Sequence, residues 1–170
     1  MSITIRELSG PDINERFLET LASLAEVQLT VTEAREIFRS QLRAGVRTYI
    51  AMIDEEIVGT ATLLVEQKFI HHGGRIGHIE DVAVHRDFQK QGIGSVLVRH
   101  TTEEAKKFGC YKVILSCFSD RVLFYERLGY HQHDVGMRLD LPHHEGQFAA
   151  GIKSSTAAAP IWMNSSCSCK

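Results

Sequence analysis

The sequence lacks the features that mark membrane, secreted and nucleic-acid-binding proteins. No apolar run comes near the ~20 residues that span a bilayer. The first residues, MSITIRELSG, lack the apolar core of about 7 to 15 residues that a signal peptide needs. The net charge of −2 leaves no basic excess, which nucleic acid or an anionic membrane would favour. We therefore expect a cytoplasmic protein with a small-molecule substrate and no nucleic-acid or membrane partner.

The sequence also has few cysteines, and their spacing excludes an obvious zinc site. Cys110 and Cys117 lie in patterned segments, and Cys167 and Cys169 lie near the C-terminal end. A zinc site needs paired Cys-x-x-Cys or Cys/His spacings, which the four residues do not provide. We predict no metal, and free thiols in a reducing compartment.

Hydrophobic periodicity predicts a strand and two helices in the first part of the chain. Residues 3–8 alternate apolar and polar side chains, as a half-buried strand does. From Asp12 to Leu24, apolar residues recur every three or four positions, which predicts an amphipathic helix. Residues 30–33 have the capping-box form, so a second helix begins near Thr30 and ends at Gly45.

The patterns that follow predict a mixed α/β sheet. The predicted elements are a hairpin of strands 48–53 and 57–65 around Asp54-Glu55-Glu56, a strand 77–84, a helix 94–108 closed by Gly109, a central strand 112–116, a short helix 122–128 and a strand 136–141. This order, in a chain of 170 residues, predicts one α/β domain over residues 1–141, with a mainly antiparallel central sheet flanked by helices. The Ser-rich residues 142–170 predict a disordered tail.

Two glycines mark a candidate anion site. Gly92 and Gly94 follow a strand and a polar turn and precede a helix, so the backbone there can approach a ligand and direct free amides at it. The helix dipole adds partial positive charge, and Lys90 adds a full one. The turn thus suits a pyrophosphate, although two glycines can also serve a tight turn alone.

The neighbouring motifs resemble a known family. Gln89-Lys90-Gln91-Gly92-Ile93-Gly94, after the strand Glu80-Asp81-Val82-Ala83-Val84, resembles the GCN5-related N-acetyltransferase (GNAT) superfamily. Residues 3–141, most densely 66–130, are most similar to the glucosamine 6-phosphate N-acetyltransferases. The motifs that carry this likeness are Lys68-Phe69-Ile70-His71, Gly77-His78-Ile79-Glu80-Asp81-Val82, the turn itself, Gly109-Cys110-Tyr111-Lys112-Val113-Ile114-Leu115 and Phe124-Tyr125-Glu126-Arg127-Leu128-Gly129-Tyr130.

The resemblance implies a GNAT fold, a homodimer and direct acetyl transfer from acetyl-CoA to the amine of glucosamine 6-phosphate, a step toward UDP-N-acetylglucosamine. The implied donor contacts are Val82, Ala83, Val84, Gln89, Lys90, Gln91, Gly92, Ile93, Gly94, Ser95 and Tyr125. The implied acceptor contacts are Lys68, Phe69, Ile70, His71, Glu80, Asp81, Tyr111, Lys112, Ser116 and Arg138. An amide of residues 82–84 would meet the oxyanion.

Acetyl transfer to an amine needs an unprotonated nitrogen and a proton for the departing thiolate. Glu80 can orient the ammonium and help to remove its proton, unless it is only a solvated strand residue. Its alternation with Asp81 predicts that the two side chains point to opposite faces. Tyr125 can protonate the thiolate as a neutral phenol, unless it only packs in the core. The cations Lys68 and Lys112 suit a phosphate, or are surface lysines.

Three departures from the family pattern concern the acceptor. Ser116 stands where the family has an aspartate, and Asp120 is a possible substitute. Ala25 stands in place of a threonine, and Asp140 in place of an arginine that Arg138 could replace. Another amino sugar, an aminoglycoside or a polyamine therefore remains an alternative acceptor. A non-catalytic acetyl-CoA sensor is the alternative of a different class.

Overall fold

The computed structural model describes residues 2–141, of which residues 2–134 form one compact unit and residues 135–141 belong to a second one that is treated separately. The strands are β1 (Thr4–Glu7), β2 (Arg47–Ile53), β3 (Glu56–Gln67), β4 (Arg75–Val84) and β5 (Cys110–Ile114). The α-helices are α1 (Glu15–Leu21), α2 (Val31–Arg43), α3 (Ile93–Lys107) and α4 (Val122–Glu126). No helix in this part of the chain is long and apolar enough to cross a membrane.

The strands form a sheet in the order β1-β2-β3-β4-β5. All pairs are antiparallel except β4 with β5, which are parallel and joined through α3. The prediction of a mixed, mainly antiparallel α/β sheet is therefore confirmed. The prediction of a central strand at residues 112–116 is wrong, because β5 runs over Cys110–Ile114 and lies at the edge of the sheet. Its Val and Ile content reflects packing on one face of the sheet only.

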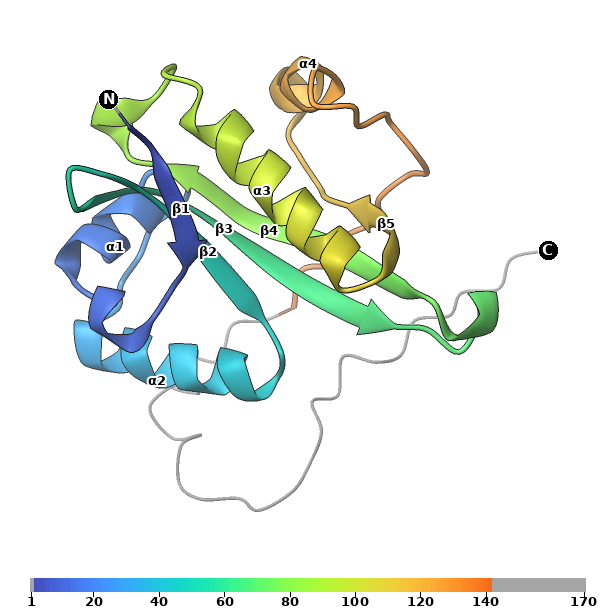
Figure 1. The fold of residues 1–170 in the computed structure, drawn as a ribbon, viewed down its shortest axis with the longest axis horizontal. Helices are drawn as coiled ribbons and strands as arrows, with labels where there is room; N and C mark the ends of the chain where they lie inside the picture. Colours follow the sequence, from blue (N-terminus) through green and yellow to red (C-terminus); the bar gives the residue numbers. More distant parts are fainter. Residues whose placement is uncertain (1, 142–170) are drawn as a thin grey trace. The chain divides into compact units, whose positions relative to one another are not determined.

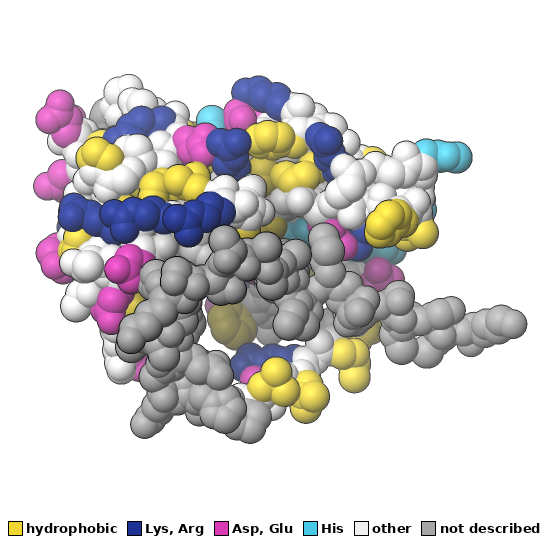
Figure 2. Space-filling view, turned by 90° about the horizontal axis from the view of Figure 1, so that it is seen from below, with side chains coloured by type: hydrophobic (Ala, Val, Ile, Leu, Met, Phe, Trp, Pro, Cys, Tyr) yellow, Lys and Arg dark blue, Asp and Glu magenta, His cyan; other side chains and the backbone are white. Residues whose placement is uncertain are grey.

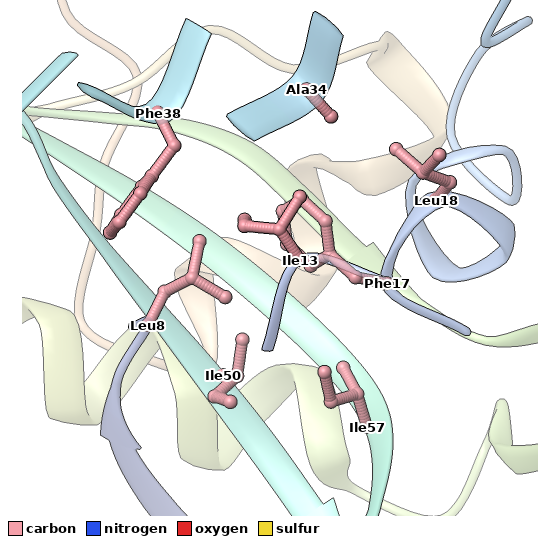
Figure 3. Packing of buried hydrophobic residues seen from close by; sticks show 8 residues of the cluster. All are labelled: Leu8, Ile13, Phe17, Leu18, Ala34, Phe38, Ile50 and Ile57. Carbon is pink, nitrogen blue, oxygen red and sulfur yellow. The ribbon is translucent and has the colours of Figure 1, made fainter. Parts of the chain in front are cut away.

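Helices cover both faces of the sheet (Figure 1). On one face, α1 and α2 enclose a core of Leu8, Ile13, Phe17, Leu18, Ala34, Phe38, Ile50 and Ile57, whose side chains converge in Figure 3. On the other face, α3 packs closely over β3. A Cβ on Gly59 would lie 2.7 Å from Leu97 Cδ1, so the glycine permits this close approach.

Local signals explain where most elements begin and end. Thr30 and Glu33 form the predicted capping box of α2, and Gly45, at φ 75°, ends that helix region. Asp54 and Glu55 have φ of 47° and 66°, so the β2–β3 hairpin closes with two left-handed residues. These predictions are confirmed.

The first helix is shorter than predicted. Residues 10–12 form a 3-10 turn, and α1 begins only at Glu15 because the Asn14 side chain accepts a hydrogen bond from the amide of Phe17 at 3.0 Å. The helix ends at Leu21, three residues before the last apolar residue of the predicted pattern. Leu24 therefore lies outside the helix, and its side chain is 49% exposed.

The strand predicted at residues 136–141 is absent from the described structure. A strand needs a ladder partner for its backbone groups, and this segment has none in the described part of the chain. Its apolar side chains, Val135, Met137, Leu139 and Leu141, are all at least 75% exposed. Arg138 donates from Nε to Asp140 Oδ1 at 2.7 Å. The predicted tail of residues 142–170, with Cys167 and Cys169, lies outside the described residues.

The surface carries charges of both signs. On the face in Figure 2, Lys and Arg side chains lie among Asp and Glu side chains and patches of hydrophobic surface. This interspersion fits the small net charge of −2.

Candidate active site

A bulge interrupts β4 beside the candidate base. Glu80 pairs with Thr62, but the next pair joins Ala83 to Thr60, so β4 has two residues where β3 has one. Asp81 lies in this bulge with φ of 49°, a left-handed conformation that aspartate tolerates better than most residues. The bulge ends the simple alternation of side chains along the strand.

The bulge overturns the predicted direction of Asp81. Ile79 packs with Leu63 in the core under α3, but Asp81 lines a cavity of about 70 Å³ on the α1–α2 side, together with Thr60 and Thr62. Glu80, directly opposite Thr62, belongs to the same side, because opposed residues in a ladder share a face. Both carboxylates therefore lie on the α1–α2 side of β4.

From Ile79 onward, β4 has no strand partner on its β5 side among the described residues. Its pairing with β5 ends at His78 and Ile114, so residues 79–84 have no β5 partner. Residues 82–84, whose amides the family resemblance implies at the oxyanion, lie within this stretch. A ligand that runs along this edge can form hydrogen bonds with the strand as β5 does nearer its start.

The turn of residues 89–94 is held against the end of β4 and presents backbone amides. Gln89 Nε2 donates to the carbonyl of Val84 at 3.2 Å, which ties the turn to the strand. Gly92, at φ 82°, is the N-cap of α3. No acceptor in the described residues meets the amides of residues 91–95, which agrees with the first turn of a helix.

The geometry of the turn fits an anion. A Cβ on Gly92 would meet nothing within 4 Å, and one on Gly94 would lie 3.5 Å from Phe124 and 3.6 Å from Val84. Lys90 is exposed beside them with φ of 63°. The amides, the helix dipole and this cation together suit a pyrophosphate.

Glu80 has the character of a proton acceptor. Water reaches its side chain, but the surrounding protein desolvates it and raises its pKa above the ordinary value of 4.5. The charge of Asp81 raises this pKa further, and His78 opposes the shift. A carboxylate with a raised pKa holds a proton more readily than an ordinary surface glutamate.

Tyr125 has the character of a neutral proton donor. Burial raises its pKa above 10.0, and the charges of Cys117 and Tyr130 add to the shift. Its ring meets Phe124 edge-on at 4.9 Å and Tyr130 at 6.0 Å. Glu80 also raises the Tyr125 pKa, so the two candidate catalytic groups lie within electrostatic range of each other. Tyr125 packs with the α3-side core, and the β4 edge lies between the two groups.

The predicted phosphate contact Lys68 is engaged with a residue that the sequence analysis missed. Lys68 Nζ pairs with Glu66, and His78 Nε2 lies 3.0 Å from the other oxygen of the same carboxylate. The hydrogen bond from Lys68, with a weaker one from His78, lowers the Glu66 pKa. Glu66 lies in β3, two residues before Lys68 and on the same face of the sheet as His78. Its spacing from Lys68 was the sequence signal for the ion pair.

Other predicted acceptor contacts gather around one aromatic ring. The rings of Tyr111 and His71 lie 5.2 Å apart, and Lys112 Nζ lies 5.8 Å from the Tyr111 ring centroid. Phe69 and Ile70, which directly precede His71, are exposed. Among residues 2–141, no group of three or more His, Cys, Asp or Glu side chains could hold a metal.

The remaining predicted acceptor residues are not brought together in the described structure. Ser116 is exposed two residues after the end of β5. Asp120 is exposed in a 3-10 turn, with its Oδ2 3.4 Å from Arg121 Nε. Arg138 lies in the second unit, to which residues 135–141 belong. Ala25 lies between α1 and α2 and is exposed.

Comparisons with known proteins agree with this geometry. Residues 14–130 match the acetyltransferase (GNAT) family. The chain is 36% identical over 144 residues to a glucosamine 6-phosphate N-acetyltransferase of Trypanosoma brucei brucei, covering 83% of this chain and 97% of that one. It is 37% identical over 138 residues to the enzyme of that name from Candida albicans, covering 79% and 93%.

A solved structure shares the fold. The crystal structure of glucosamine-6-phosphate N-acetyltransferase from Arabidopsis thaliana superposes with a TM-score of 0.78 at 28% identity, covering 84% of this chain and all of that one. Acetyltransferases of the matched family use acetyl-CoA as the acetyl donor. With a strand, bulge and turn suited to that donor, this chain belongs to the acetyltransferase (GNAT) family.

Proposed function

We propose that this enzyme transfers the acetyl group of acetyl-CoA to the amine of glucosamine 6-phosphate, giving N-acetylglucosamine 6-phosphate and CoA. The observation that carries the proposal is the extent of the match: the chain covers 97% of the Trypanosoma enzyme of that name at 36% identity. The product would enter the cytoplasmic synthesis of UDP-N-acetylglucosamine.

The donor would lie along the edge of β4 from Ile79 onward, with its pyrophosphate at the turn. The amides of residues 91–95 and the charge of Lys90 would bind the pyrophosphate, with Gln89 holding the turn in place. The pantetheine arm would follow residues 82–84 toward Tyr125. An amide of that stretch would then meet the thioester oxygen, whose negative charge grows in the transition state.

The chemistry would proceed in one ternary complex. Glu80 attracts the ammonium group and accepts its proton, and the free amine attacks the thioester carbon. As the C–S bond of the tetrahedral intermediate breaks, the leaving thiolate takes a proton from Tyr125. The nitrogen, which still carries one proton more than the amide product, releases it through water to the Tyr125 phenolate, and Glu80 gives up the first proton to solvent. The raised pKa values of both groups support these roles, because Glu80 can hold the proton and Tyr125 stays neutral until the thiolate departs.

The acceptor phosphate would bind near Tyr111. Lys112 forms no ion pair with a carboxylate in the described residues, so its charge is available to a phosphate. His71 contacts the same Tyr111 ring. Lys68 already pairs with Glu66, so a phosphate would have to compete for it. Phe69, Ile70, Asp81, Ser116 and Arg138 complete the proposed acceptor contacts.

The active form is proposed to be a homodimer. In residues 135–141, apolar side chains alternate with Gly136, Arg138 and Asp140, and the four apolar ones are exposed. This is the pattern of a strand that buries one face against a partner. A second copy of the chain would supply that partner and bring Arg138 toward an acceptor site, with residues 1–141 as the catalytic domain.

Thiol release by the full chain with acetyl-CoA and a panel of amines tests the function. Turnover with glucosamine 6-phosphate, at least 100-fold above that with glucosamine, an aminoglycoside and a polyamine, is the expected result. Ser116, which lacks the family's negative charge, favours a different amine as the second candidate, and preference for another member of the panel would establish it. Donor binding without turnover of any amine would show a sensor.

A further inference from the structure

One arginine of α1 reaches the segment that carries the chain from β4 into the donor turn. Arg16 Nη1 lies 2.9 Å from His85 Nε2, and the guanidinium carbon lies 5.8 Å from the Phe88 ring centroid. A guanidinium has only donors, so His85 Nε2 accepts this hydrogen bond. The two rings meet edge-on at 6.1 Å. One side chain therefore contacts both ends of residues 85–88.

Residues 85–88 are themselves firmly held. His85 is 5% exposed, and its amide donates to the Val58 carbonyl at 2.9 Å. The Phe88 amide donates to the His85 carbonyl at 2.9 Å. Gln89, the first residue of the turn, follows directly. The sheet thus fixes one side of this segment, and Arg16 closes the other.

The same guanidinium also meets two acidic residues. Arg16 Nη2 donates to Glu56 at 3.0 Å, and Nη1 lies 3.6 Å from Glu19. Both carboxylates are about 60% exposed, so these pairs contribute little to stability. The contact with buried His85 is the one that reaches the donor turn.

We propose that Arg16 is a positioning residue for acetyl-CoA, which it serves by fixing His85 and Phe88 and through them the turn of residues 89–94. The inference rests on the proposed role of that turn in donor binding. Several amides must meet the pyrophosphate at once, so a small displacement weakens all of these hydrogen bonds together. Lysine cannot replace Arg16, because a single ammonium lacks the planar fork that contacts the imidazole and the phenyl ring at once.

Calorimetric titration of the full chain with CoA tests this without any acceptor. Arg16→Met keeps an apolar stem and removes the guanidinium, and Arg16→Lys keeps the charge. We expect both to raise the Kd for CoA about tenfold, which is about 1.4 kcal/mol. Glu56→Gln removes the negative charge from the contact with Nη2 of the same guanidinium, and Arg39→Met removes an exposed arginine of α2. Both controls should stay within about twofold of the wild type.

Steady-state kinetics separate positioning from general damage. The KM for acetyl-CoA should rise about tenfold in Arg16→Met, with kcat and the acceptor KM within about twofold. His85→Asn should give the same change, and the double variant should be no worse, because both substitutions break one contact. If Arg16→Met does not fold, His85→Asn and Arg16→Lys carry the same expectation.

Three results would overturn the proposal. If the wild type binds CoA and Arg16→Met binds it equally well, Arg16 does not position the donor, although the proposed function stands. If kcat and the thermal midpoint fall and both KM values rise together, Arg16 is only a structural residue. A wild type that binds no CoA would remove the donor site itself, and this inference with it.

Discussion

Glu80 lies directly opposite Thr62, and the β3–β4 ladder slips by one residue immediately after that pair. The slip turns Asp81 to the α1–α2 side of the sheet, beside Glu80, whose pKa it helps to raise. Asp81 thus acts on the candidate base Glu80 through its charge, because the bulge places both side chains on the same side of the sheet.

Replacing Glu80 with Gln should lower kcat about 100-fold, because a positioned proton acceptor contributes at least that factor. The KM for acetyl-CoA should change by less than about twofold. Initial rates with glucosamine 6-phosphate measure both. Glu103→Gln, on the exposed surface of α3, serves as the matched control. Wild-type turnover in Glu80→Gln would remove Glu80 from the mechanism.

The pH profile should carry the signature of Glu80. Its pKa is raised above 4.5 by desolvation and by Asp81, so the carboxyl becomes protonated, and inactive as a base, at a higher pH than an ordinary glutamate. The acid limb of kcat/KM should therefore have a midpoint above 4.5. The limb should disappear in Glu80→Gln, and its persistence there would assign it to another group.

Replacing Tyr125 with Phe should lower kcat by about 10- to 100-fold, because the ring still packs but the phenol proton is gone. The thermal midpoint should stay within a few degrees of the wild type. Tyr130→Phe is the matched control: it removes the hydrogen bond between the Tyr130 hydroxyl and Thr102 Oγ1, 2.7 Å long, and should cost about 1 kcal/mol of stability with kcat unchanged. Equal kcat in Tyr125→Phe and wild type would leave Tyr125 as a packing residue.

The Arg6–Asp12 pair should make stability depend on pH. The hydrogen bond from Arg6 lowers the Asp12 pKa from 3.8 to about 2. A carboxyl with a lowered folded-state pKa stabilises the fold above its unfolded pKa and loses that effect as the pH falls through the folded value. Asp12→Asn should therefore lower the free energy of unfolding by up to about 2 kcal/mol at pH 7. Urea denaturation should show a smaller difference between the two proteins at pH 3, and a constant difference would contradict this linkage.

The homodimer should depend on the apolar side chains of residues 135–141. Met137→Lys places a charge in that set and should shift the chain from dimer to monomer in light scattering at micromolar concentration. His133→Lys, just before the alternating run, should remain a dimer. A wild type that is monomeric would refute the proposal directly.

Much of the fold follows from local patterns, since caps and turns act within a few residues. The capping box at Thr30 and the glycines Gly45 and Gly109 fix helix ends without help from distant parts of the chain. The same holds for the turn at Gly92, whose left-handed φ needs glycine most. The backbone geometry of the turn in the candidate site was accordingly predictable.

The features that the sequence did not predict depend on pairing between distant segments. The direction of Asp81 follows from the register of β3 against β4, and a one-residue slip is invisible in either strand alone. The contact of Glu66 with His78 and the contact of Arg16 with His85 likewise require the folded sheet. For residues 136–141, alternation indicates an extended chain but does not supply the partner that makes it a strand.

The parallel pairing of β4 and β5 has a consequence for the order of folding. Antiparallel neighbours such as β2 and β3 meet through a tight turn, but β5 reaches β4 only after the whole of α3 has crossed the sheet. Strands β2, β3 and β4 can therefore assemble through one hairpin and one short loop before β5 joins. Under the proposed function, the edge along which the thioester would lie is therefore complete only when α3 has crossed the sheet and β5 has paired with β4.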